Sequence, residues 1–247
     1  MSRDKQSPQD THASPGSPPR VESPTESLGA RTHAQVEALA AGFRDQLSRA
    51  LGVDLPEGAH ALAYVDHYLS MLRDETREPI LALVAAGAGA WFGDLVCREV
   101  GATWIGDGVE PRRLRLLLEP IFLHFSPVDL AYEAIFSGPA GEDDPRLPAG
   151  AELDAGFHLR KRPMPADPDG ETTEATEDPI SDHDWVMARL AEAAPIPEDQ
   201  FYSLTGRFET LTLILELVAG RMAAQGRKPT PYHLNDYLAE LSRAELG

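Results

Sequence analysis

Apolar residues recur at helical spacing in two long segments of the chain. In the segment 201–222, seven large apolar side chains follow steps of three and four, which is typical of one face of an amphipathic helix. In the segment 79–104, small residues follow a similar spacing, at Ala82, Ala86, Gly89, Gly93 and Cys97. Glycine inside a helix costs about 0.5–1 kcal/mol relative to alanine, so we expect another backbone to lie close to this face. We predict that the large side chains of the second segment fill the groove of the first.

Shorter patterns predict the remaining elements. Thr32 followed by Gln35 has the form of a capping box, so we predict a helix from Thr32 to about residue 51. Further helices are predicted over 59–74, 127–138, 184–193 and 229–241. Segments rich in β-formers at 102–105, 113–116 and 120–125 predict a small antiparallel sheet, and 156–160 is a candidate for one more strand. The predicted fold class is α+β and predominantly helical: a long small-residue helix packed on a C-terminal amphipathic helix, with a small antiparallel sheet.

Two segments are poor in large apolar residues. Residues 1–31 contain five prolines and six serines, and 163–179 is rich in acidic residues and proline. Such segments cannot bury enough apolar surface to offset the entropy lost on ordering. We predict a disordered tail over 1–31, followed by a single α+β domain over 32–247 that contains a flexible acidic loop at about 163–179.

The charge of the chain limits its partners. The net charge is −18, and a surface of that sign repels phosphate backbones and anionic lipid, which argues against nucleic acid and membranes as partners. A basic protein partner fits this charge, and so does simple solubility. The apolar run 80–93 is shorter than the roughly 20 residues of a membrane span, and the first residues lack the apolar core of a signal peptide. We therefore expect a cytoplasmic location; the oligomeric state stays open.

Two groups of residues have the composition of metal ligands. His60 and His67 lie seven positions apart on one side of a predicted helix, and Asp66 is adjacent to His67. Imidazoles and carboxylates bind zinc, although a spacing of four is the usual one on a helix, and solvated histidines are the alternative. The triplet 182–184, Asp-His-Asp, has a simpler interpretation, in which Ser181 or Asp182 caps the following helix.

Three further residues are candidates for ligand binding. Arg207 lies beside the apolar stripe of its helix, where it either pairs with a carboxylate such as Asp94 or Glu99 or holds a ligand anion. Trp91 and Trp104 either line an aromatic pocket or fill the core.

Familiar catalytic motifs are missing. The sequence has no phosphate-binding glycine loop, nucleophile elbow, His-Glu-x-x-His or dinucleotide fingerprint. The single cysteine, Cys97, excludes an internal disulfide and any site of several thiolates. We predict no cofactor.

Two segments resemble a known pattern. The sequence GAGAWFGDLVCREVGATW, residues 87–104, is similar to small uncharacterised bacterial domains with a Gly-Ala-aromatic-aromatic-Gly-acid helix followed by a Gly-x-x-Trp strand. The segment FYSLTGRFETL, residues 201–211, resembles a C-terminal helix of such proteins. The resemblance implies an α+β fold and no activity.

Two functions remain. The acidic charge and the missing motifs favour a non-catalytic protein-interaction or regulatory module. The alternative is a small-molecule or metal-dependent enzyme whose site is built from distant residues, such as His60, His67 and a carboxylate.

Overall fold

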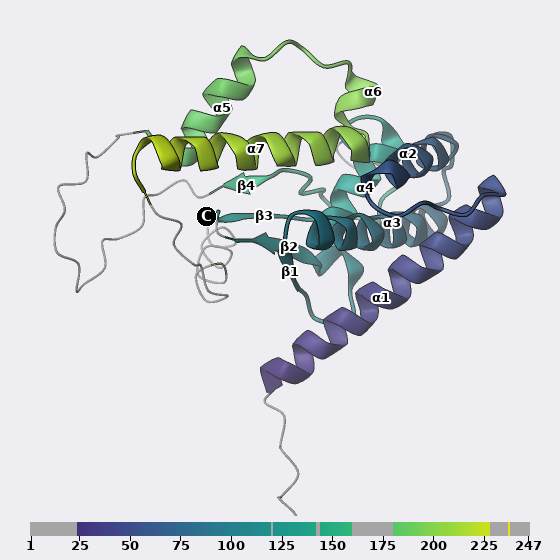
Figure 1. The fold of residues 1–247 in the computed structure, drawn as a ribbon. Helices are drawn as coiled ribbons and strands as arrows, with labels where there is room; N and C mark the ends of the chain where they lie inside the picture. The colour runs from purple at the N-terminus through teal and green to yellow at the C-terminus, as the bar shows by residue number, and fades with distance from the viewer. Residues whose placement is uncertain (1–23, 120, 142–143, 160–179, 228–236, 238–247) are drawn as a thin grey trace, which may run out of the picture.

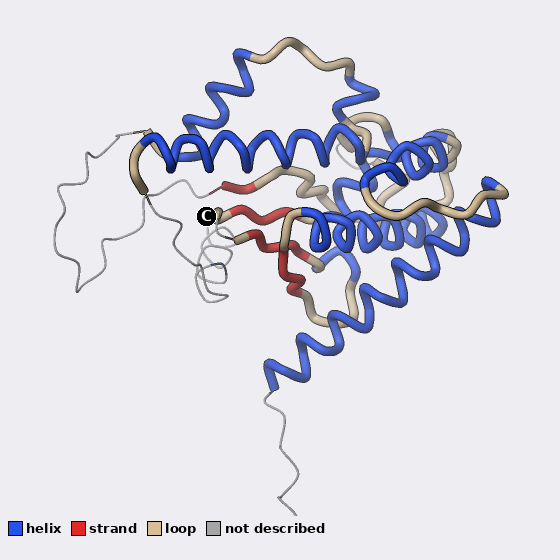
Figure 2. The backbone as a smooth tube through the Cα atoms, in the orientation of Figure 1, coloured by secondary structure: helices blue, strands red, loops and turns tan. Residues whose placement is uncertain are grey.

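The fold combines seven helices with one small sheet in the part of the chain that can be described. A computed structural model describes residues 24–119, 121–141, 144–159, 180–227 and 237 (Figures 1 and 2). The helices are α1 (Pro24–Leu51), α2 (Leu62–Ser70), α3 (Glu78–Glu99), α4 (Pro127–Phe136), α5 (Asp182–Glu192), α6 (Glu198–Phe201) and α7 (Leu204–Ala224). Two 3-10 turns are η1 (Ala59–Ala61) and η2 (Pro111–Arg113). The strands are β1 (Ala102–Ile105), β2 (Arg115–Leu118), β3 (Leu123–Phe125) and β4 (His158–Leu159). The predicted class, predominantly helical α+β, is confirmed.

Helices α3 and α4 form the centre of the core. All ten residues of α4 are buried, and the main helix neighbours of α3 are α1 and α4. A Cβ atom at Gly89 would lie 2.6 Å from the Cα of Val128, so the start of α4 crosses α3 at backbone distance. A Cβ at Gly93 would overlap the ring of Trp104 in the same way. The expected close backbone approach is therefore present.

The helix that fills this groove differs from the predicted one. The small-residue face of α3 receives α4 at Gly89 and the sheet at Gly93, and α7 packs mainly against α2, α4, α5 and α6. The buried face of α7 is also rotated from the predicted stripe, because it includes Arg207 and Arg221. Phe201, the first residue of that stripe, is exposed and belongs to the separate helix α6. Apolar periodicity could not locate this face, because the buried guanidinium group of each arginine is stabilised by hydrogen bonds to groups that lie far away in the sequence.

The sheet is a meander in the order β1-β2-β3-β4, antiparallel throughout. Its inner face carries Leu116, Leu118, Leu123 and Phe125, all buried in the main core. Its outer face carries Leu117 and His124 and, on β4, His158. A second apolar cluster covers part of the outer face, where Tyr237 stacks on Phe122 with ring centroids 4.2 Å apart. The candidate strand at 156–160 is present as β4.

The beginning of the chain differs from the prediction. Helix α1 starts at Pro24, within the segment predicted to be a disordered tail. Thr32 is not an N-cap: it is buried in the helix, and its Oγ1 donates a hydrogen bond to the carbonyl oxygen of Gly106 at 3.1 Å. The rest of the predicted tail, the acidic loop at 163–179 and most of the helix predicted at 229–241 lie outside the described residues.

Helix α3 is the one described helix whose length and composition would allow it to cross a membrane. Its most apolar window is 72% buried inside the protein. That burial is typical of a core helix, in agreement with its position between α1 and α4.

Candidate functional site

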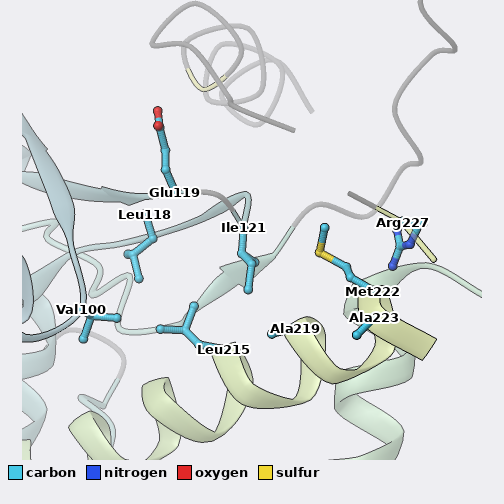
Figure 3. Close-up of a pocket in the computed structure, with 9 residues that line it drawn as sticks. All are labelled: Val100, Leu118, Glu119, Ile121, Leu215, Ala219, Met222, Ala223 and Arg227. Atoms are coloured by element: carbon cyan, nitrogen blue, oxygen red, sulfur yellow. The ribbon is translucent and has the colours of Figure 1, made fainter. Parts of the chain in front are cut away.

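An apolar pocket lies between the C-terminal half of α7 and the turn that joins β2 to β3 (Figure 3). Its volume is about 320 Å³, and it is lined by Val100, Leu118, Glu119, Ile121, Leu215, Ala219, Met222, Ala223 and Arg227. Seven of these nine residues are apolar. Figure 3 shows the Glu119 carboxylate pointing away from the apolar side chains. We call this cavity the α7 pocket.

Two sets of polar contacts hold the α7 wall of the pocket in place. At the N-terminus of α7, the Asp66 carboxylate accepts hydrogen bonds from the backbone N–H groups of Leu204 at 2.8 Å and Thr205 at 3.1 Å. The first N–H groups of a helix have no partner within the helix, and a carboxylate near them is also stabilised by the positive end of the helix dipole. Burial raises the pKa of Asp66, and these hydrogen bonds oppose that rise.

At the other end of α7, Arg221 lies buried against the start of α5. Its guanidinium donates to the carbonyl oxygens of Ile180 and Ser181 and to Asp182 Oδ1 at 3.0 Å. Arg227, at the rim of the pocket, donates to the same carboxylate at 2.8 Å. The positive charge at the rim is thus already paired, which leaves the pocket with an apolar character.

Arg207 forms an internal ion pair with a partner that was not predicted. Its Nη2 lies 2.5 Å from Glu133 Oε2 of α4, and both side chains are buried. The rings of Phe201 and Tyr202 lie over the guanidinium at 4.6 and 5.2 Å. Asp94 and Glu99, the partners predicted from sequence, do not make this contact. Burial raises the pKa of Glu133, and Arg207 opposes the rise. The pair therefore holds α7 against α4, and the charge of the buried guanidinium is balanced by Glu133.

The two candidate tryptophans do not line a common pocket. Trp91 is 2% exposed within α3. Trp104 lies on β1 over Gly93, and its Nε1 donates to Asp94 Oδ1 at 3.2 Å. Two positions separated by two residues point to nearly opposite sides of a helix, so Trp91 and the Gly93 contact of Trp104 face different directions. Both rings act as packing residues.

The candidate metal ligands do not assemble. His60 lies in η1 and His67 in α2, both exposed, and Asp66 is occupied with the start of α7. Among the residues that can be described, no group of three His, Cys, Asp or Glu side chains could hold a metal ion. In the triplet at 182–184 the cap interpretation is confirmed, since Ser181 Oγ accepts from the N–H of Asp184 at 3.0 Å. Cys97 is half-buried, and desolvation raises its pKa to about 11, which disfavours the thiolate.

No protein-family model, curated protein or solved structure matches this chain. Its functional sites must therefore be argued from geometry.

A polar cluster on the outer face of the sheet was missed in the sequence. The rings of His124 (β3) and His158 (β4) are stacked, with centroids 4.8 Å apart and planes 18° apart. His158 Nε2 lies 2.6 Å from Asp154 Oδ1, and Arg115 Nη2 lies 3.9 Å from the other carboxylate oxygen. We call these four residues the outer-face cluster. Only strand pairing brings them together, because 34 residues separate the two histidines, so no local motif could reveal them.

The geometry of the outer-face cluster excludes metal binding by both imidazoles. Imidazole coordinates a metal through a nitrogen lone pair that lies in the plane of the ring. Lone pairs of two nearly parallel stacked rings do not converge on one point. The cluster is held instead by ring stacking and by the contacts of Asp154 with His158 and Arg115.

Proposed function

We propose that this protein is a non-catalytic interaction module that receives an apolar side chain of a basic protein partner in the α7 pocket. The observation that carries the proposal is the pocket itself, about 320 Å³ of apolar space at the surface of a chain with a net charge of −18. A volume of this size is at the lower end of the range for ligand sites.

The composition of the pocket favours a protein over a small molecule. Small-molecule sites contain a few polar groups that converge on the ligand and orient it. Here the two charged lining residues are at the edge, where Glu119 points outward and Arg227 is paired with Asp182. Orientation must then come from contacts outside the pocket, and the acidic surface of the chain supplies them to a basic partner.

A peptide probe tests this proposal. The probe is a fluorescent amphipathic peptide of leucine and lysine, compared with a peptide of the same pattern in which glutamate replaces lysine. We expect the basic peptide to bind and the acidic one not to bind. Ala219→Trp, which fills the pocket from an exposed position, should weaken binding about tenfold or more, equivalent to about 1.4 kcal/mol. Fluorescence anisotropy at physiological salt measures the dissociation constants.

The matched control is Leu213→Trp, which adds the same ring at an exposed position of α7 outside the pocket. It should leave the affinity unchanged. Equal affinity of the wild-type protein and Ala219→Trp would contradict the proposal, because the peptide would then bind by charge alone. Failure of the basic peptide to bind would contradict it as well.

The enzymatic alternative lacks a comparable observation. His60 and His67 are exposed and no third ligand joins them among the described residues. Metal analysis of the purified protein separates the two functions, since stoichiometric zinc or iron would favour the enzyme.

A further inference from the structure

Strand β4 lies at one edge of the sheet, next to β3, and its described part is two residues long. It pairs with β3 through two positions, Leu123 with Leu159 and His124 with His158. Leu159 points into the main core, whereas the imidazole of His158 lies on the outer face, stacked on that of His124. On the outer face, β4 is held by this stack of two titratable rings; on the inner side it is held by Leu159 and by Phe157, whose ring contacts that of Phe125.

His124 is buried as a neutral imidazole. The residue is 7% exposed, and its Nδ1 has no hydrogen-bond partner among the described atoms. Desolvation, together with the neighbouring His158 and Arg115, lowers the pKa of His124 from its ordinary value of 6.5 to about 4, while Asp154 opposes the shift. Among the described residues, these are the titratable and charged groups that face His124 from β4, from β2 and from the segment before β4. Phe122 contacts the ring edge-on and carries no charge.

We propose that the outer-face cluster is a proton-operated latch on β4, in which uptake of a proton by His124 releases β4 from β3. A protonated His124 would lie against His158 with Arg115 nearby, so like charges would face each other across the strand pair. The charged ring would also be cut off from water, which further disfavours the closed arrangement. The desolvation cost and the contact with His158 are relieved when β4 separates, because His124 then becomes hydrated, whereas Arg115 stays in place on β2.

A fixed point immediately before β4 confines the opening to the strand itself. The backbone N–H of Asp154 donates to the buried carboxylate of Asp129 at 3.0 Å, and Arg112 donates to that carboxylate and to the carbonyl oxygen of Glu152. This anchor does not involve His124. His158 contacts this anchor through Asp154 Oδ1 at 2.6 Å, so the opening separates His158 from Asp154.

The direction of the pH effect follows from linkage. The closed state binds a proton at His124 more weakly than the open state does, so closure is most favourable above pH 6.5 and loses stability as the pH falls towards 4. The pKa of His124 is taken as 6.5 in the open state and about 4 in the closed state. With these values, the population of the open state should rise about 20-fold between pH 7 and pH 5.

Hydrogen exchange of the β3 and β4 amides, corrected for the intrinsic effect of pH on exchange, measures the opening. We expect their protection to fall about 20-fold from pH 7 to pH 5 and to be insensitive to low urea, which marks a local opening. In His124→Phe, which keeps a flat ring but cannot be protonated, the protection should no longer depend on pH. His67→Phe, at an exposed histidine of α2, should behave as the wild type.

Three results would overturn the latch. Protection that does not change with pH in the wild-type protein is one, and an unchanged pH dependence in His124→Phe is another. The third is β4 exchange that responds to low urea as strongly as the core of α3, because β4 would then open only by global unfolding. If His124→Phe does not fold, His124→Gln serves the same comparison.

Discussion

Gly89 occupies a core position that is closed off by the backbone of another helix. A Cβ atom there would meet three backbone atoms of α4 at 2.6–2.8 Å, and backbone cannot move aside as a flexible side chain can. Gly42 in α1 has nothing within 4 Å of the same position. The two residues are both helical glycines, and they differ in what surrounds them.

We expect Gly89→Ala to destabilise the protein by about 1–3 kcal/mol, since overpacking outweighs the gain in helix propensity. Gly42→Ala should stabilise it by about 0.5–1 kcal/mol, because propensity acts there without opposition. Chemical denaturation of both variants measures the two changes. If Gly89→Ala is as harmless as Gly42→Ala, α4 does not lie at backbone distance from α3.

Gly87 makes a close contact that the spacing of small residues does not predict. The small-residue seam predicts Gly89 and Gly93 as contact positions and leaves Gly87 outside it. In the structure, a Cβ at Gly87 would lie 2.9 Å from the Cβ of Phe43 in α1, so the opposite side of α3 is also tightly packed. Helical spacing identifies one close face, but a helix buried between two others has more than one.

At the scale of elements, the sequence located the helices better than their faces or ends. Regular apolar spacing places α3 and α7 correctly, because both stripes are long. The buried face of α7 depends on Glu133 for Arg207 and on the Ile180 and Ser181 carbonyls for Arg221. The first partner is 74 residues away in the sequence and the others about 40, too far for a local pattern to indicate.

The start of α7 is secured by a residue of another helix, and its removal should be measurable. Asp66→Ala removes the acceptor of three hydrogen bonds, from two N–H groups and from Thr205 Oγ1. We expect a loss of about 1–3 kcal/mol in the free energy of unfolding. Asp66→Asn, which keeps one acceptor oxygen, should lose less, and urea denaturation compares the two. A neutral Asp66→Ala would mean that water replaces the carboxylate without cost.

The whole molecule is arranged around α4, with partners drawn from most of the described chain. It packs against α3 and α2, which precede it, and against α7, which follows it. The sequence predicts a short helix over 127–138, and in the structure Ser126 is the N-cap of α4. Its central position could not be predicted, because ten residues with two acids, Asp129 and Glu133, resemble a surface helix. Both carboxylates are buried through arginines from other elements.

During synthesis, the dependence of buried Glu133 on Arg207 determines when the region around α4 can fold. Glu133 leaves the ribosome well before Arg207, so a growing chain holds a carboxylate in its centre whose counter-charge has not yet been made. A buried charge without its partner is strongly unfavourable, and we expect chains stalled before α7 to stay open around α4 and be cut there by protease. Chains stalled after α7 has emerged should resist cutting. Protection that arises before Arg207 is synthesised would contradict this order, because the first half would then fold without α7.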